Sequence, residues 1–150
     1  MRALVTRGTV RPDAAALLGA AAPELERRYG EVLLVMGDGA SPADAVMGLK
    51  DAVGISERKP PARILAVVAP EVIEDTALAA FAAVKSLARE TAMTANCVNA
   101  LWLKPGKLPG WRAPFDLWAE AARLVPALLQ TESTTGQVFI VGPASTAVPL

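Results

Sequence analysis

The sequence predicts one α/β domain spanning residues 1–150, with about five parallel strands between two layers of helices. Short apolar runs typical of strands alternate with longer segments that have helical periodicity. This alternation favours a parallel sheet wrapped by helices, because each parallel connection must cross over the sheet. The chain also has the length of one domain, and no repeat, low-complexity tract or linker divides it. We therefore expect a three-layer architecture around one hydrophobic core.

The first part of the chain contains two predicted strands. Residues 2–6 form a short apolar and β-branched run that ends at a turn. A helix is expected to open at Pro12 and to restart over residues 23–29, because proline is favoured in the first turn of a helix. The second strand, Glu31–Met36, is nearly unbroken in its apolar character, which is typical of a strand buried on both faces.

The rest of the chain continues the alternation. Ser41 and Pro42 are a typical cap and first-turn pair, so a helix is expected to begin there. Residues 102–114 are rich in proline and are expected to form a long loop. The remaining predicted elements are a helix over residues 42–53, a strand over 64–68, a long helix over 72–93, a strand over 96–101, a helix over 115–129 and a strand over 137–141.

The long predicted helix is non-polar on two faces. One stripe at helical spacing is expected to pack on the sheet. The second face carries small side chains, which let another helix approach closely. A surface helix with two non-polar faces usually buries both of them. This helix is therefore a candidate interaction surface. The sheet-facing stripe comprises Ile73, Ala77, Ala80, Phe81, Val84, Ala88 and Ala92, and the second face comprises Ala79, Ala82, Ala83 and Ser86.

The composition argues against several classes of partner. Hydrophobic residues make up 53% of the chain and charged residues 20%, so more apolar surface than usual must be buried, and a partner is one place to bury it. Fifteen basic and fifteen acidic side chains cancel, so we expect neither nucleic acid nor an anionic membrane as a partner. No apolar run has the length of a membrane span. A single cysteine fits a reducing cytoplasm.

Few side chains in the sequence are suited to catalysis or metal binding. The chain contains no histidine, and its only cysteine, Cys97, lies in an apolar run where a buried, inert thiol is expected. Gly8 is the only glycine in the turn after the first strand, so we expect an ordinary turn and not a phosphate-binding loop. Direct binding of a phosphate by Arg7 and Arg11 is the alternative.

Three stretches of the sequence resemble the short-chain dehydrogenase/reductase family. Residues 82–100 contain Ala-Ala-Val-Lys-Ser-Leu-Ala-Arg-Glu-Thr-Ala followed by Asn-Cys-Val-Asn-Ala, similar to a helix and the next strand of that family. Residues 26–39 resemble its helix ending in E-R-F-G and its strand L-V-N-N-A-G. Residues 135–141, Thr-Gly-Gln-Val-Phe-Ile-Val, look like its closing strand. The resemblance implies a truncated Rossmann-like domain from which the family's second and third strands are missing.

The same comparison implies that the family's functional residues are missing too. Ala77 and Phe81 stand where the family has its catalytic tyrosine and lysine, and its serine falls near residues 68–70. The glycine fingerprint and the acidic residue that binds the ribose are lost with the missing strands. We therefore expect no catalytic residue, no nucleotide cofactor and no metal. Whether the chain is an enzyme on its own stays open, and a non-catalytic role is favoured.

The resemblance also implies an interface, because in this family the corresponding helices pack against those of a neighbouring subunit. The leading hypothesis is a subunit that pairs with an active short-chain dehydrogenase or with itself. The alternative is a divergent oxidoreductase or a protein that binds an acyl or aromatic molecule at the carboxyl ends of the strands. The interface residues would be Val46, Leu49, Val53, Ala79, Ala82, Ala83, Ser86 and Arg89, and the pocket residues would be Asp38, Trp102, Lys104 and Trp111.

Overall fold

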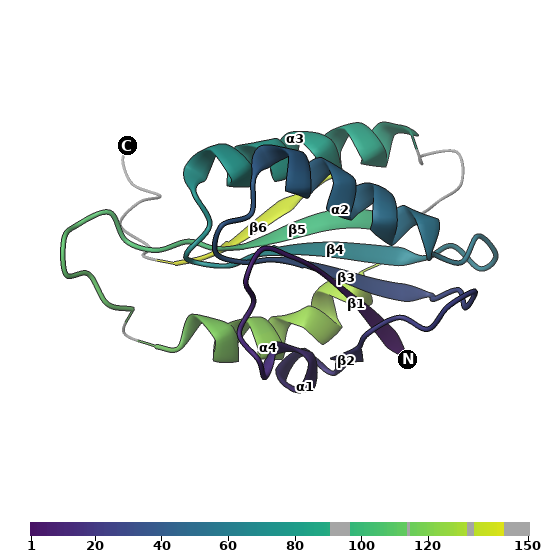
Figure 1. The fold of residues 1–150 in the computed structure, drawn as a ribbon, viewed down its shortest axis with the longest axis horizontal. Coiled ribbons are helices and arrows are strands. Elements are labelled where there is room, and N and C mark those ends of the chain that lie inside the picture. The colour runs from purple at the N-terminus through teal and green to yellow at the C-terminus, as the bar shows by residue number, and fades with distance from the viewer. Residues whose placement is uncertain (91–96, 114, 132–133, 143–150) are drawn as a thin grey trace.

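In the part of the chain that the structure describes, six parallel strands form one sheet in the order β2-β1-β3-β4-β5-β6 (Figure 1). The computed structural model describes residues 1–90, 97–113, 115–131 and 134–142. Neighbouring strands pair in parallel throughout, which confirms the expected Rossmann-like sheet. The strands are β1 (Arg2–Arg7), β2 (Ala20–Ala21), β3 (Glu31–Met36), β4 (Arg63–Val68), β5 (Cys97–Leu103) and β6 (Val138–Val141).

Helices cover both faces of the sheet. Figure 1 shows α2 (Pro42–Gly54) and α3 (Glu74–Glu90) side by side on one face. The short helix α1 (Ala14–Leu18) and helix α4 (Leu117–Leu129) lie on the other face. The three layers follow from the strands themselves, because a parallel strand that is apolar on both sides must be covered on both sides.

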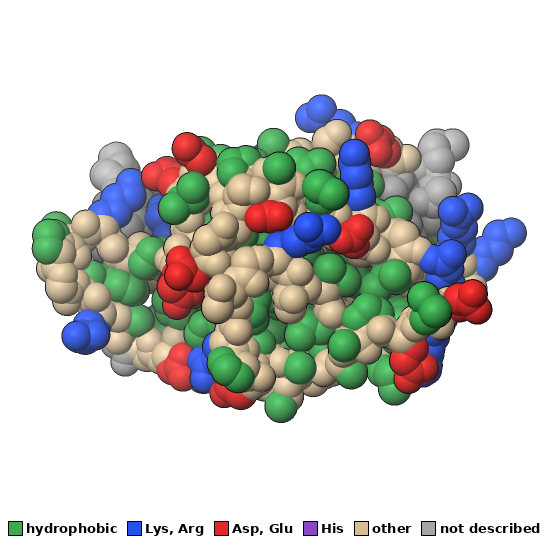
Figure 2. Space-filling view, viewed as in Figure 1, with side chains coloured by type: hydrophobic (Ala, Val, Ile, Leu, Met, Phe, Trp, Pro, Cys, Tyr) green, Lys and Arg blue, Asp and Glu red, His purple; other side chains and the backbone are tan. Residues whose placement is uncertain are grey.

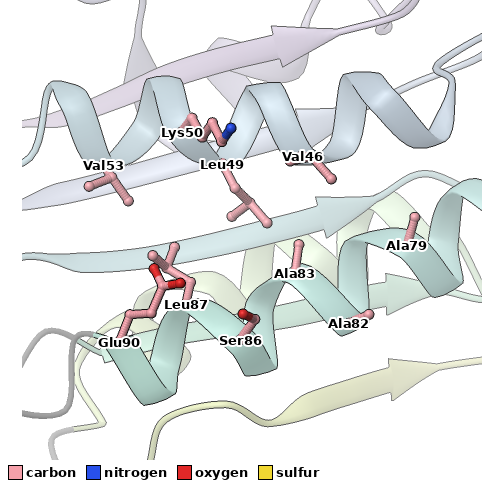
Figure 3. Close-up of a pocket in the computed structure, with 10 residues that line it drawn as sticks. All are labelled: Val46, Leu49, Lys50, Val53, Ala79, Ala82, Ala83, Ser86, Leu87 and Glu90. Carbon is pink, nitrogen blue, oxygen red and sulfur yellow. The ribbon is translucent and has the colours of Figure 1, made fainter.

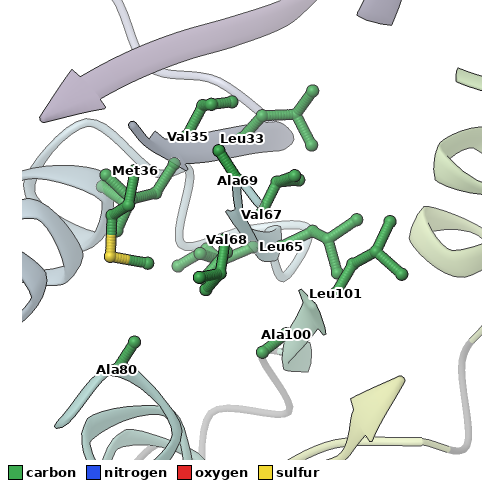
Figure 4. Packing of buried hydrophobic residues seen from close by; sticks show 14 of the residues in the cluster. Leu33, Val35, Met36, Leu65, Val67, Val68, Ala69, Ala80, Ala100 and Leu101 are labelled. Carbon is green, nitrogen blue, oxygen red and sulfur yellow. The ribbon is translucent and has the colours of Figure 1, made fainter. Parts of the chain in front are cut away.

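The core lies on both sides of the central strands. Every residue of β3 after Glu31 and every residue of β4 after Arg63 is buried. Figure 4 shows Met36 and Val68 on the side of α2 and α3, and Leu65 and Leu101 on the side of α4. The unbroken apolar run seen in the sequence is thus explained by a strand with two buried faces.

Helix α2 begins with a capping box, packs closely on β3 at a glycine and pairs with an arginine of β1. The side chain of Ser41 accepts a hydrogen bond from the backbone N–H of Asp44, and the Asp44 carboxylate accepts one from the Ser41 N–H, forming a capping box. A Cβ atom at Gly48 would come within 2.7 Å of Leu34 Cδ1, so a larger residue there would force the Leu34 side chain to move. Arg7 on β1 pairs with Asp51 at 2.5 Å and with Asp44 at 3.7 Å.

The segment before β3 corrects two sequence expectations. The predicted helix over residues 23–29 is wrong, and this also removes the helix from the match of residues 26–39 to the dehydrogenase family. Glu26 has φ of 65°, which no right-handed helix allows, and the Tyr29 hydroxyl accepts a hydrogen bond from the Glu24 N–H at 2.8 Å. A sixth strand, β2, was not predicted. Helix α1 ends at Gly19 in the left-handed conformation, and the chain then extends beside β1.

Several predicted boundaries also need correction. The long helix begins at Glu74, and Ile73 is exposed instead of facing the sheet. Residues 91–93, with Ala92, and residue Asn96 lie outside the described residues. At the start of β1, Arg2 and Ala3 pair with β2. In the described part of the chain, residues 4–7 of β1 pair on one side only, with β3.

Shortening a side chain in the doubly buried strand should destabilise the whole domain. Leu34 is fully buried. We expect Leu34→Ala to lower the free energy of unfolding by about 2–5 kcal/mol, because it removes buried methyl groups and leaves a cavity. Leu25→Ala is the matched control, since Leu25 is 93% exposed and its loss should change the free energy by less than about 0.5 kcal/mol. Urea denaturation measures both, and equal effects would contradict this assignment of the core.

Candidate functional site

A groove with a volume of about 660 Å³ runs between α2 and α3 on the outer side of their layer (Figure 3). Figure 3 shows side chains of α2 and α3 lining it from opposite sides. Most of the lining is apolar, and Lys50 and Glu90 add one charge of each sign. The lining residues, here called the α2–α3 groove, are Val46, Leu49, Lys50, Val53, Ala79, Ala82, Ala83, Ser86, Leu87 and Glu90.

The groove collects nearly all of the residues that were expected to form an interface. Val46, Leu49 and Val53 line it from α2, and Ala79, Ala82, Ala83 and Ser86 line it from α3. Arg89 instead borders a neighbouring hollow with Lys85 and the start of β6. The groove is also lined by Lys50, Leu87 and Glu90, which were not predicted. Each of them follows a predicted lining residue at helical spacing, so the same pattern could have identified them.

Apolar surface continues outside the groove over the same helix layer. Met47 on α2 and Leu78 on α3 are each 53% exposed. Figure 2 shows hydrophobic side chains on this layer, toward the top of the view, among scattered charged ones. Exposed apolar side chains that lie next to an apolar groove are typical of protein interaction sites.

The loops that follow β1 and β3 are joined to each other by backbone hydrogen bonds. The Thr9 N–H donates to the Asp38 carbonyl at 2.8 Å, and the Asp38 N–H donates to the Thr9 carbonyl at 2.9 Å. The Gly37 N–H donates to the Arg7 carbonyl at 2.8 Å. In dinucleotide-binding folds the pyrophosphate binds to free amides at this edge of the sheet. Here these three amides already have partners within the chain.

Two glycines make this junction possible. Gly8 has φ of 74°, and a Cβ atom there would lie 2.7 Å from the carbonyl oxygens of Gly37 and Asp38. A Cβ atom at Gly37 would lie 2.1 Å from the Thr9 carbonyl oxygen. The glycine after the first strand therefore serves loop packing, which supports the expectation of a turn without a phosphate cradle.

The two arginines that could have bound a phosphate are both engaged within the chain. Arg7 pairs with Asp44 and Asp51. Arg11 forms two hydrogen bonds with the Asp13 carboxylate, at 2.5 and 2.9 Å. This contact raises the pKa of Arg11 and lowers the pKa of Asp13, so both stay charged and paired at neutral pH.

The four expected pocket residues are not brought together in one cavity. Asp38 lines a hollow of about 330 Å³ with Arg11, Glu71 and Trp118. Trp102 and Lys104 line a separate hollow of about 150 Å³. Within it the Lys104 ammonium lies 4.9 Å from the centre of the Trp102 ring. The Trp111 ring packs against Gly106 and lines neither hollow.

The positions that correspond to the family's catalytic tyrosine and lysine are used for packing. Ala77 and Phe81 are both buried, and the Phe81 ring lies 5.1 Å from the Trp102 ring. Among the described residues, no group of three or more acidic, histidine or cysteine side chains could hold a metal ion. Within the same ranges, no helix is long and apolar enough to cross a membrane.

Proteins with a similar fold are found among solved structures. No family model and no curated protein matches the sequence. The acetoin dehydrogenase of Enterobacter cloacae is 20% identical with a TM-score of 0.56, and the match covers 89% of this chain and 70% of that one. The acetoin dehydrogenase of Salmonella typhimurium is 19% identical with a TM-score of 0.59, covering 95% and 85%.

A short-chain dehydrogenase/reductase from Serratia marcescens is 14% identical with a TM-score of 0.52, covering 94% of this chain and 95% of that one. At such identities the likeness concerns the fold. The chain therefore has the fold of the short-chain dehydrogenases/reductases, as the resemblance in its sequence implied.

Proposed function

We propose that this chain is a non-catalytic subunit that associates through the α2–α3 groove with another chain of the same fold. The observation that carries the proposal is the groove itself, which gathers seven of the eight residues expected to form an interface. Association is favourable when a partner helix covers an apolar groove between two helices, because the apolar surface is then removed from water. In the short-chain dehydrogenase family, as the resemblance implies, helices of this position pack between subunits.

The side chains on α3 suit close contact with a helix. The lining of the groove on α3 includes three short side chains, those of Ala79, Ala82 and Ala83. A partner helix can therefore approach until the two helix axes are about 8–10 Å apart. Val46 and Val53 on α2 would then pack beside the partner helix. Lys50 and Glu90 lie in the groove, and a partner could pair with either.

The non-catalytic part of the proposal is supported at two places. The amides of Thr9, Gly37 and Asp38 are bonded within the chain, so they do not offer donors to a pyrophosphate. Ala77 and Phe81 cannot supply the phenol and the ammonium that the family uses to move a proton. No histidine elsewhere in the sequence could replace them.

A charge placed in the groove should prevent association. Ala82 is exposed on α3. We expect Ala82→Glu to raise the dissociation constant of the assembly by on the order of 100-fold, because a carboxylate would be buried against apolar surface. Sedimentation velocity measures this with the chain alone and with a co-expressed active short-chain dehydrogenase from the same genome.

Ala119→Glu is the matched control, since Ala119 is an exposed alanine on α4, on the opposite face of the sheet. Both variants should keep the helical circular dichroism spectrum, because glutamate is a good helix former. A stable monomer of the unmodified chain in both samples would remove the basis of the proposal. So would Ala82→Glu and Ala119→Glu having the same effect.

The chain should not bind a nicotinamide cofactor. We expect calorimetric titration with NAD, NADP or an acyl thioester to give no saturable heat, because the loop amides and both nearby arginines are already bonded. An active short-chain dehydrogenase titrated in parallel is the positive control. Tryptophan fluorescence gives a second readout, since Trp118 borders the hollow beside Asp38. Saturable binding with turnover would favour the alternative of a divergent oxidoreductase.

A further inference from the structure

A second hollow, with a volume of about 570 Å³, lies between the last two turns of α3 and the start of β6. Lys85, Ala88 and Arg89 line it from α3, and residues 135–138 line it from the other side. It shares no lining residue with the α2–α3 groove. Its volume lies within the range of about 300–1,000 Å³ that is typical of sites for small molecules.

The hollow carries positive charge that the protein does not compensate. Lys85 and Arg89 are four residues apart on α3, so their Cβ atoms are neighbours at about 5–6 Å, and both side chains are exposed. Neither forms an ion pair in the described part of the chain, and none of the described lining residues is acidic. Like charges at this spacing destabilise a helix. The helix dipole favours a base in the last turn, where Arg89 lies, but it does not account for Lys85 one turn earlier.

The wall opposite the two cations is held in place by hydrogen bonds to β5. The Gly136 N–H donates to the Val98 carbonyl at 2.7 Å, and the Gln137 N–H donates to the Asn99 side-chain oxygen at 3.0 Å. The exposed Gln137 side chain adds a carboxamide, which can donate two hydrogen bonds. This wall therefore offers a fixed polar surface across from the two positive charges.

Part of the lining is apolar. Ala88 lies on α3 between Lys85 and Arg89, and Val138 adds a second apolar side chain from β6. A ligand that fits this lining needs negative charge at two points and an apolar part that can contact Ala88 and Val138. An inorganic ion with a single charged centre has no such apolar part.

We propose that this hollow binds a short aliphatic dicarboxylate. The guanidinium of Arg89 takes one carboxylate through two parallel hydrogen bonds, and the ammonium of Lys85 takes the other as a point charge. The methylene groups between the carboxylates cover Ala88 and Val138. This inference goes beyond the proposed function, because the hollow lies outside the α2–α3 groove, and it gives Arg89 a role other than the expected one at the interface.

Titration of the ¹⁵N-labelled chain with glutarate tests the site. We expect saturable shifts of the backbone amides of Gly136 and Gln137 at constant ionic strength, because the ligand lies against these residues. Pentanoate has the same chain length and a single carboxylate, so it should bind more weakly by about tenfold or more. Inorganic phosphate is titrated in parallel as the rival anion, and it should also bind more weakly than glutarate.

Substitution of the two cations identifies their contribution. We expect Lys85→Gln and Arg89→Gln each to raise the Kd of glutarate by about tenfold or more, because each removes one charge-assisted contact. Lys50→Gln and Arg112→Gln are the matched controls, since Lys50 lines the α2–α3 groove and the exposed Arg112 lies in the loop after β5. These controls should change the Kd by less than about twofold, because they remove the same charges at a distance from the hollow.

Several outcomes would overturn the inference. They are the absence of a saturable shift, binding of phosphate or pentanoate as tight as that of glutarate, and equal effects of the hollow variants and their controls. Loss of association in Arg89→Gln with unchanged glutarate binding would also overturn it, because Arg89 would then belong to the interface. The proposed function is tested separately by Ala82→Glu, which lies outside this hollow.

Discussion

The burial of β3 and β4 on both faces is the constraint on which the rest of the structure depends. Parallel strands that are apolar on both faces cannot leave either face in water, so the chain must supply a helix layer on each side. Helices α1 and α4 form one layer and α2 and α3 form the other. The buried sides of α2 and α3 pack on the sheet and complete the core. On the outer side of the same layer, mostly apolar side chains of the two helices line the α2–α3 groove.

Elements with a strong local pattern were predictable, and elements defined by distant contacts were not. Glu31–Met36 was predicted with its observed bounds, because a short, unbroken apolar run between turn residues is typical of a strand buried on both faces. Helix α2 begins where Ser41 and Pro42 indicate. Residues 23–29 have the local pattern of a helix, but Tyr29 bonds to Glu24 and pairs with the segment after α2. Strand β2 has only two residues, too few for any periodicity.

One part of the candidate site was predictable from the sequence and another part was not. The groove was predictable on the α3 side, because small residues repeat there at helical spacing and helical geometry places them on one face. The pocket at the strand ends was not predictable, because it depends on loop conformations. Asp38 follows β3, Trp102 lies near the end of β5, and the two line different hollows. The hydrogen bonds between the loops after β1 and β3 join residues far apart in the sequence, and two glycines are a weak local sign of such a contact.

The packing of Gly37 on Thr9 has a consequence for how this edge of the sheet could change over evolutionary time. Any side chain at Gly37 would collide with the Thr9 carbonyl oxygen, and any side chain at Gly8 would collide with the loop after β3. Point substitutions at these glycines therefore damage the loops before they create room for a ligand. Room for a ligand at this edge of the sheet would therefore require a change in the length or the path of these loops, such as an insertion between β1 and α1.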